Sequence, residues 1–282
     1  MSEDILTQIV THKKQEIRAA RQLRPEASLR AELPPIKTRR SFCERLTASN
    51  PQGINIIAEI KRASPSKGLI RPNLDPAVYA REYEGGGAAA LSVLTDPYFF
   101  KGSLDDLKTA RQAATLPVLR KDFIISAYQI FETALIGADA LLLIAAILSQ
   151  QQLQDYLALC KELGLDALVE IHDEDEHQKV TRAGANLIGI NNRNLKTFHT
   201  DIHTSISMAS RLSKHQVGVA ESGIRTPADI DAVRRAGICN FLIGESLVRA
   251  DSPRLFLRSL IGCKGADKQG GRANRKVSNG RK

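Results

Sequence analysis

The sequence predicts an α/β fold, a (β/α)8 TIM barrel preceded by an N-terminal helical extension. From about residue 53, short apolar segments alternate with longer amphipathic ones, as expected for strands that are each followed by a helix. The length of 282 residues is close to the ~250 residues of a typical single barrel. An open doubly wound sheet is the rival, but KRASPSKG after the first predicted strand lacks its GxGxxG turn.

The helical extension is expected to occupy residues 1–45. Two helices are predicted in it, over residues 2–24 and 26–33, and Pro25 separates them. Ser2 is a plausible N-cap of the first helix, because acidic residues follow it in the opening turn, where the helix dipole favours them.

The barrel itself is expected over residues 46–263. Eight strands are predicted at 54–60, 88–94, 117–121, 140–144, 166–170, 187–191, 216–221 and 240–244. Helices are predicted near 76–85, 103–114, 127–136, 149–163, 174–183, 203–213, 227–236 and from about 246. Glycines that fit helix C-cap positions are Gly85, Gly137, Gly164, Gly184 and Gly237.

The basic charge of the chain lies at its two ends. The net charge is +9, of which residues 264–282 contribute +6 and residues 1–40 contribute +4, so residues 41–263 carry −1. A nucleic-acid-binding domain usually carries its basic charge on the folded body, so no nucleic-acid partner is expected. Residues 264–282 lack an apolar pattern and are predicted to be a disordered basic tail.

Cysteine and hydropathy patterns point to a reducing, cytoplasmic setting. The four cysteines are scattered without metal-ligand spacing, so no metal is expected. The longest apolar run, Ala140 to Leu148, is far shorter than the ~18–20 residues that cross a bilayer, and the first residues do not resemble a secretory leader.

Polar residues that can do chemistry follow the predicted strands. They are Glu59, Lys61, Lys121, Glu170, Asn191 and Glu221. Side chains two apart on a strand share a face, and in each case an apolar residue precedes the polar one on that face. The carboxyl ends of barrel strands meet around one site, where buried charges are costly unless they pair or react. The sequence therefore predicts an active site at this end of the barrel.

Lys121 suits a general acid, because nearby Lys61 and an apolar wall would favour the loss of its proton. Glu170 suits a proton carrier on the opposite side of a substrate, where it would not neutralise Lys121 directly. A structural ion pair of Lys121 with Asp122 or Glu59 is the alternative.

Two glycine-containing turns, at 221–223 and 244–246, follow the last two predicted strands. Such turns favour a phosphate site built from backbone N–H groups, and ordinary barrel turns are the alternative. We therefore expect a small phosphorylated substrate. The basic segment 62–71 is either a mobile lid or a solvated loop. The histidines, His172 among them, are expected to be structural or solvent-facing.

Seven motifs, taken in order, resemble the indole-3-glycerol phosphate synthase family of tryptophan biosynthesis: INIIAEIKRASPSKG, LSVLTDPYFFKGS, PVLRKDFI, LVEIHDEDE, IGINNRNL, AESGIRTPAD and FLIGESL. The resemblance spans roughly residues 40–260. It implies that 1-(2-carboxyphenylamino)-1-deoxyribulose 5-phosphate closes its ring to give indole-3-glycerol phosphate, CO2 and water. No cofactor is expected for this reaction, because loss of CO2 needs none if a cation offsets the charge on the ketone oxygen. The N-terminal extension also resembles that of the family, where it helps to close the site. Other tryptophan-pathway enzymes are conceivable partners.

The resemblance also implies residue roles. Lys121 would activate the ketone oxygen, Glu170 would assist dehydration, Glu59 would orient the lysines and Lys61 would anchor the substrate carboxylate. Asn191 and Glu221 would complete the polar ring. The implied pocket for the aromatic ring is Pro65, Phe100, Phe123 and Leu195. The other implied substrate or phosphate positions are Ser64, Arg193, Ser222, Gly223, Leu242, Gly244 and Glu245.

Three other functions are weighed against this one. A sugar-phosphate isomerase of tryptophan or histidine biosynthesis would use a Cys/Asp or Asp/Asp pair, and no cysteine stands at a predicted strand end. A basic binding module would depend on the two chain ends. A barrel that has lost activity would not keep the complete set of polar residues.

Overall fold

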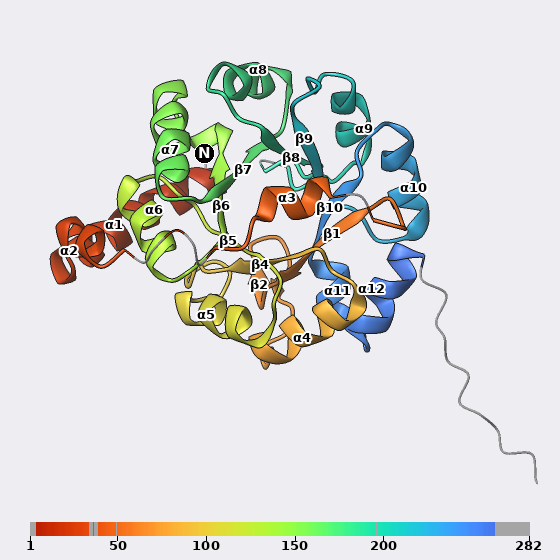
Figure 1. The fold of residues 1–282 in the computed structure, drawn as a ribbon, viewed down its shortest axis with the longest axis horizontal. Coiled ribbons are helices and arrows are strands. Elements are labelled where there is room, and N and C mark those ends of the chain that lie inside the picture. Colours follow the sequence, from red (N-terminus) through yellow and green to blue (C-terminus); the bar gives the residue numbers. More distant parts are fainter. Residues whose placement is uncertain (1–3, 34–35, 37–38, 49, 196, 263–282) are drawn as a thin grey trace, which may run out of the picture.

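Eight parallel strands form a closed barrel within the part of the chain that the computed structural model describes, residues 4–33, 36, 39–48, 50–195 and 197–262 (Figure 1). The strands are β1 Asn55–Ile60, β4 Ala90–Leu94, β5 Val118–Lys121, β6 Ala140–Ile144, β7 Asp166–Ile171, β8 Leu187–Asn191, β9 Val217–Glu221 and β10 Asn240–Ile243. Their order around the barrel follows the chain, and β10 pairs with β1 to close it. The predicted fold class is confirmed.

A ring of helices surrounds these strands (Figure 1). They are α4 Pro76–Gly86, α5 Leu104–Ala113, α6 Ala127–Leu135, α7 Gln150–Glu162, α8 Glu174–Arg182, α9 His203–Ala209, α10 Pro227–Arg235, α11 Glu245–Arg249 and α12 Pro253–Ile261, with the short 3-10 helix η2 Ala145–Ile147. Two helices, α11 and α12, follow the last strand where one was predicted. The predicted C-cap at Gly85 is wrong, because α4 continues through Gly86 and Gly87 caps it in the left-handed region.

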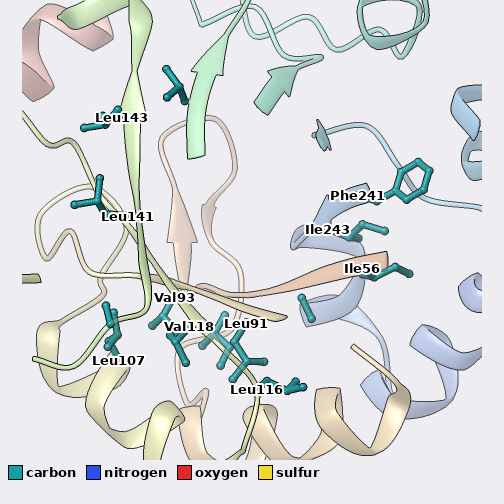
Figure 2. Close-up of a cluster of buried hydrophobic side chains, with 14 of the residues drawn as sticks. Ile56, Leu91, Val93, Leu107, Leu116, Val118, Leu141, Leu143, Phe241 and Ile243 are labelled. Atoms are coloured by element: carbon teal, nitrogen blue, oxygen red, sulfur yellow. The ribbon is translucent and has the colours of Figure 1, made fainter. Parts of the chain in front are cut away.

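The buried apolar side chains form two layers. An outer layer lies between strands and helices and includes Ile56, Val118 and Phe241 (Figure 2). An inner layer fills the barrel and includes Ile57 and Leu119, the sequence neighbours of two of these residues. The alternation follows from the strand period of two, and it makes both faces of most strands mainly apolar below the polar ends.

The N-terminal helices lie beside α6, on one side of the barrel (Figure 1). They are α1, Ile5–Leu23, and α2, Glu26–Ala31. The N-cap of α1 is Asp4, whose side chain accepts a hydrogen bond from the Leu6 N–H at 3.4 Å. The predicted N-cap, Ser2, lies outside the described residues, and so does the whole predicted basic tail, residues 264–282.

A helix that was not predicted, α3 Phe42–Thr47, closes the amino-terminal end of the barrel. Phe42 and Leu46 are buried against the inner core layer. The Cys43 N–H donates to the Asp166 carboxylate at 2.8 Å, at the start of β7. The expected boundary between extension and barrel, at residue 45, lies within this helix.

A buried lysine fastens α1 to the opposite, carboxyl-terminal end of the barrel. Lys13 Nζ lies 2.9 Å from Asp96, 3.1 Å from Asp122 and 2.6 Å from Glu16, and its side chain is 3% exposed. Burial by itself would raise the pKa of Asp122, but Arg120 and Lys13 outweigh it and lower that pKa to about 2. The Asp122 carboxylate that follows β5 is therefore held as an anion, and it holds α1 in place together with Asp96, which follows β4.

The basic segment 62–71 forms a small hairpin rather than an unstructured loop. Strands β2 Ala63–Ser64 and β3 Gly68–Leu69 pair antiparallel. Arg62 forms a two-pronged ion pair with Asp106, one contact of which is 3.0 Å long.

Among the described residues, none of the helices combines the length and the hydropathy of a membrane span.

Replacing Lys13 with Met should release α1 from the barrel. The substitution leaves the buried Asp96 and Asp122 carboxylates without their shared cation, a change that typically costs 3–5 kcal/mol. We expect amide hydrogen exchange in α1 to accelerate well before exchange in the barrel strands. The exposed neighbour Lys14, replaced by Met, is the control. Equal exchange rates in α1 of the two variants would contradict this role.

Candidate active site

A cavity of about 470 Å³ opens at the carboxyl-terminal ends of the barrel strands. All seventeen residues that were predicted from the sequence or from the family resemblance line this one cavity. The extension contributes to it as well, because Ile5, Leu6 and Ile9 of α1 face the same space. The site is therefore covered by the helix that Lys13 holds in place.

Glu59 and Lys61 form a close ion pair at the end of β1. Lys61 Nζ lies 2.7 Å from Glu59 Oε1, and Glu59 is 5% exposed. Gly244, at the end of β10, makes room for this pair, since a Cβ there would lie 2.3 Å from Glu59 Oε1 and 2.9 Å from Lys61 Nζ. Position 244 therefore has a second reason to be glycine, besides the phosphate-binding turn that was predicted there: a larger residue would collide with the Glu59–Lys61 pair.

Lys121 reaches into the cavity from the end of β5 and contacts two carboxylates. Its Nζ lies 3.1 Å from Glu170 Oε2 and 3.3 Å from Glu221 Oε2. The expectation that Lys121 and Glu170 would not neutralise each other directly is wrong for the free protein. The alternative pairing with Asp122 or Glu59 is also wrong, because the first turns to Lys13 and Arg120 and the second to Lys61.

The protonation of Lys121 also differs from the expectation. Burial acts to lower its pKa, but Glu170, Glu221 and Glu59 outweigh burial and raise the pKa above its ordinary value. Lys61, which was expected to weaken the hold of Lys121 on its proton, is instead neutralised by Glu59. Lys121 is therefore a charged donor that faces the cavity.

Glu170, at the end of β7, is the partner that remains ionised. Burial would raise its pKa, but the ammonium of Lys121 and then His172 and Asn191 lower it below the ordinary value. Asn191, from β8, donates its Nδ2 to Glu170 Oε1 at 3.1 Å. Each oxygen of this carboxylate thus has a donor of its own.

Glu221, at the end of β9, behaves in the opposite way. Burial raises its pKa to about 7, and the neighbouring Glu170 and Glu59 add to the effect while Lys121 opposes it. Its Oε1 is buried without a hydrogen bond from any residue that the structure describes. Gly189, in the middle of β8, leaves space for this oxygen, since a Cβ there would lie 2.1 Å from it.

The turn after β9 has the backbone shape that the sequence suggested for an anion site. Ser222 and Gly223 both adopt left-handed backbone, with φ of 65° and 80°. Such backbone is unfavourable for serine and is found where surrounding structure imposes it. Asn192 helps to hold the turn in this conformation, because its Nδ2 donates a hydrogen bond to the Ser222 carbonyl at 2.9 Å.

The rest of the rim is apolar on one side and charged on the other. The rings of Phe100 and Phe123 lie 6.0 Å apart and form part of the cavity wall. On the charged side, Arg193 donates to the Ser66 hydroxyl at 3.0 Å. The carboxylate of Glu245 pairs with Arg249 at 3.1 Å, so at least one of its oxygens is already engaged.

A contact beside the site was not predicted from the sequence. His172 was expected to be structural or solvent-facing, but its Nε2 lies 3.5 Å from Glu170 Oε1. Its place two residues after Glu170, on the same face of the chain, was the signal that could have found it. Lys13 also had a signal, because it stands between Ile9 and Ile17 on the apolar face of the predicted helix. The described residues contain no cluster of His, Cys, Asp or Glu able to hold a metal ion.

The raised pKa of Glu221 predicts how the unfolding free energy of the protein changes with pH. Its ordinary value is 4.5 and its folded value is about 7, so between these pH values the folded protein keeps a proton that the unfolded chain releases. The unfolding free energy should therefore fall as pH rises through this window. Glu221→Gln cannot titrate, so its stability relative to the original protein should increase from about pH 5 to about pH 8 in urea unfolding.

Ser246→Ala, on the rim of the same cavity, is the control for this experiment. We expect no comparable trend with pH, since neither the serine nor the alanine side chain titrates in this range. A stability difference for Glu221→Gln that stays flat or decreases between about pH 5 and about pH 8 would contradict the assignment.

Comparison of the chain with known proteins identifies its relatives. The family model described as indole-3-glycerol phosphate synthase matches residues 6–260. The chain is 56% identical over 259 residues to indole-3-glycerol phosphate synthase of Desulfosudis oleivorans, covering 92% of this chain and 98% of the relative. It is 51% identical over 259 residues to the enzyme of the same name from Syntrophobacter fumaroxidans, with the same coverage.

Solved structures share the fold at much lower identity. 3-Hexulose-6-phosphate synthase from Salmonella typhimurium matches with a TM-score of 0.59 and 13% identity, covering 74% of this chain and 98% of that chain. Thiamine phosphate pyrophosphorylase from Pyrococcus furiosus matches with a TM-score of 0.56 and 14% identity, covering 76% and 97%. These likenesses show the barrel alone. The family match and the identity to its members show that the chain belongs to the indole-3-glycerol phosphate synthase family of tryptophan biosynthesis.

Proposed function

We propose that the protein converts 1-(2-carboxyphenylamino)-1-deoxyribulose 5-phosphate into indole-3-glycerol phosphate, CO2 and water. The observation that carries the proposal is the Lys121 ammonium, which faces the cavity between Glu170 and Glu221 at 3.1 and 3.3 Å. A ring closure onto a ketone needs a cation and proton donor at the ketone oxygen, and a buried ammonium supplies both.

The cavity has three regions that match the three parts of this substrate. The left-handed turn at Ser222 and Gly223, with the start of α11, suits the phosphate, because backbone N–H groups there can approach an anion closely. Lys61 suits the carboxylate that is later lost as CO2. Phe100 and Phe123, with Pro65 and Leu195, suit the aromatic ring.

In the first step, Lys121 donates its proton to the ketone oxygen while the ring carbon attacks the ketone carbon. The raised pKa of Lys121 ensures that the proton is present. It also makes Lys121 a weak acid in the free protein, so transfer becomes easier when substrate separates its ammonium from Glu170 and Glu221. The new hydroxyl stands on the former ketone carbon, and CO2 leaves with its bonding electrons retained by the ring.

In the second step, water leaves and the indole becomes aromatic. The departing hydroxyl takes up a proton from solvent and leaves as water, and the ring system gives up a proton of its own. Glu170 is suited to this second transfer, because its pKa is held low enough for it to accept a proton at neutral pH. Glu59 keeps Lys61 in place by the 2.7 Å ion pair, and Asn191 fixes the orientation of Glu170.

The isomerase alternative receives no support from the geometry. Cys43, Cys160 and Cys239, the cysteines that the structure describes, do not line the cavity. A Cys/Asp acid–base pair is therefore not assembled from these residues.

Replacing Lys121 with Met should abolish most of the turnover. Loss of a general acid typically lowers kcat by 10²–10⁴-fold, and we expect roughly 10³-fold here, with Glu170→Gln losing less. Formation of indole absorbance from the carboxyphenylamino substrate, without added metal or cofactor, is the assay. The exposed Lys108→Met, in α5, is the control. A kcat for Lys121→Met within about tenfold of the original, ~1.4 kcal/mol, would refute the role of Lys121.

Glycine at position 189 should matter for turnover although it touches no substrate. The Cβ of Gly189→Ala would lie 2.1 Å from Glu221 Oε1, so the carboxylate must move and disturb Lys121. Overpacking of this kind costs about 1–3 kcal/mol, and we expect kcat to fall at least about tenfold while circular dichroism stays unchanged. Gly85→Ala is the control, because its Cβ meets only the mobile end of Arg254. Equal kcat values for the two variants would show that the position of Glu221 is unimportant.

A further inference from the structure

His172 is a half-buried imidazole on the outer side of Glu170. It follows the end of β7 and shares a face of the chain with Glu170, two residues earlier. Its side chain is 16% exposed, and its two ring nitrogens face two carboxylates. Nδ1 lies 3.1 Å from Glu176 Oε2, and Nε2 lies 3.5 Å from Glu170 Oε1. His172 thus links an active-site carboxylate to one in the first turn of α8.

The Glu176 end of this link is rigid. Glu176 Oε2 also accepts the backbone N–H of His172 at 2.8 Å. The backbone N–H of Glu176 in turn donates to the N-cap Asp173 at 2.9 Å. An acidic side chain in the first turn is further stabilised by the helix dipole. The imidazole is consequently held from outside the cavity, in an orientation that Glu170 does not determine.

The Glu170 end is incompletely bonded. Nε2 of His172 is buried and has no hydrogen bond from the described residues, although it lies at ion-pair distance from Glu170 Oε1. That oxygen already accepts from Asn191 at 3.1 Å, and the other oxygen faces Lys121 at 3.1 Å. A carboxylate oxygen can accept a second donor, so Glu170 has a place for the Nε2–H.

The charged groups around the imidazole favour its protonated form. Burial lowers the pKa of His172, but the hydrogen bond to Glu176 and the charges of Glu170, Glu176 and Glu221 together raise it above its ordinary value. Lys121 is the opposing cation, and it lies on the far side of Glu170. Because Nδ1 faces the Glu176 carboxylate, Nδ1 carries a proton, and protonation adds the second proton at Nε2, toward Glu170.

We propose that His172, held by Glu176, is a positioning residue that keeps Glu170 ionised and correctly oriented when Lys121 turns away from it to the substrate. The proposal rests on the proposed function in this one respect, that substrate engages Lys121. In the free protein the Lys121 ammonium stabilises the Glu170 anion. During turnover that stabilisation weakens, and Nε2–H of His172, 3.5 Å away, is placed to replace it.

Kinetics over a range of pH test the positioning role. In His172→Leu we expect kcat to fall about 10–100-fold with KM within about twofold, as is typical when a group that orients a reacting side chain is removed. The acidic limb of the kcat profile should move to higher pH, because Glu170 then protonates more readily. His172→Gln, whose amide can still donate toward Glu170, should recover part of kcat.

The control separates positioning from general damage. His177, buried in α8 and bonded to Gln216 at 3.1 Å, lies outside the cavity, and His177→Leu should leave the acidic limb where it is. If His172→Leu also leaves the limb in place, or if His172→Gln recovers nothing, the proposal is overturned.

A second measurement does not depend on turnover. Titration of the His172 imidazole by NMR should show a pKa above that of a free histidine, and the value should drop in Glu170→Gln and in Glu176→Gln. A value unchanged in both variants overturns the link between the three residues. Failure of the unaltered protein to convert the substrate would contradict the proposed function instead, and the titration would still decide whether His172 is bound to both carboxylates.

Discussion

Lys121 places a positive charge in the mouth of the barrel on a side chain that is 15% exposed, and the carboxylates around it compensate that charge. Isolated burial of an ammonium would drive off its proton, whereas Glu170 and Glu221 at 3.1 and 3.3 Å reverse that tendency. That charge lowers the pKa of Glu170 below its ordinary value, whereas burial and the neighbouring Glu170 and Glu59 raise the pKa of Glu221 to about 7 although Lys121 opposes them. One cavity thus holds a protonated lysine, Lys121, an ionised glutamate, Glu170, and a second glutamate, Glu221, whose pKa is about 7.

The positions of these groups depend on features well away from the chemistry. Gly189 and Gly244 leave the space that the carboxylates of Glu221 and Glu59 occupy, and any Cβ at either position would overlap an oxygen. Lys13 binds α1 to the carboxylates that follow β4 and β5, and α1 in turn covers the cavity. The extension and the barrel therefore share one polar network around the same end of the strands.

The barrel and the residues that line the cavity could be predicted, because both follow from local sequence patterns. Apolar periodicity marks the strands, and parity on each strand places its last polar residue inside. Partner choice could not be predicted in this way. Nothing local shows that Lys121 turns to Glu170 rather than to Asp122, which Lys13 occupies from a distant helix. Helix α3 was not predicted, because it is a single short segment whose burial depends on the finished barrel. The cytoplasmic setting, the disordered tail and pathway partners remain predictions.

The central claim is that the Lys121 charge, which its carboxylate neighbours preserve against burial, acts on the ketone oxygen of the substrate. It is tested most directly by a crystal structure of the unaltered protein with the substrate whose ketone has been reduced to an alcohol. The account predicts the alcohol oxygen within about 3 Å of Lys121 Nζ, with the Lys121–Glu170 contact lengthened to admit it. An alcohol oxygen bound to Lys61 alone, with the 3.1 Å contact between Lys121 and Glu170 intact, would contradict it.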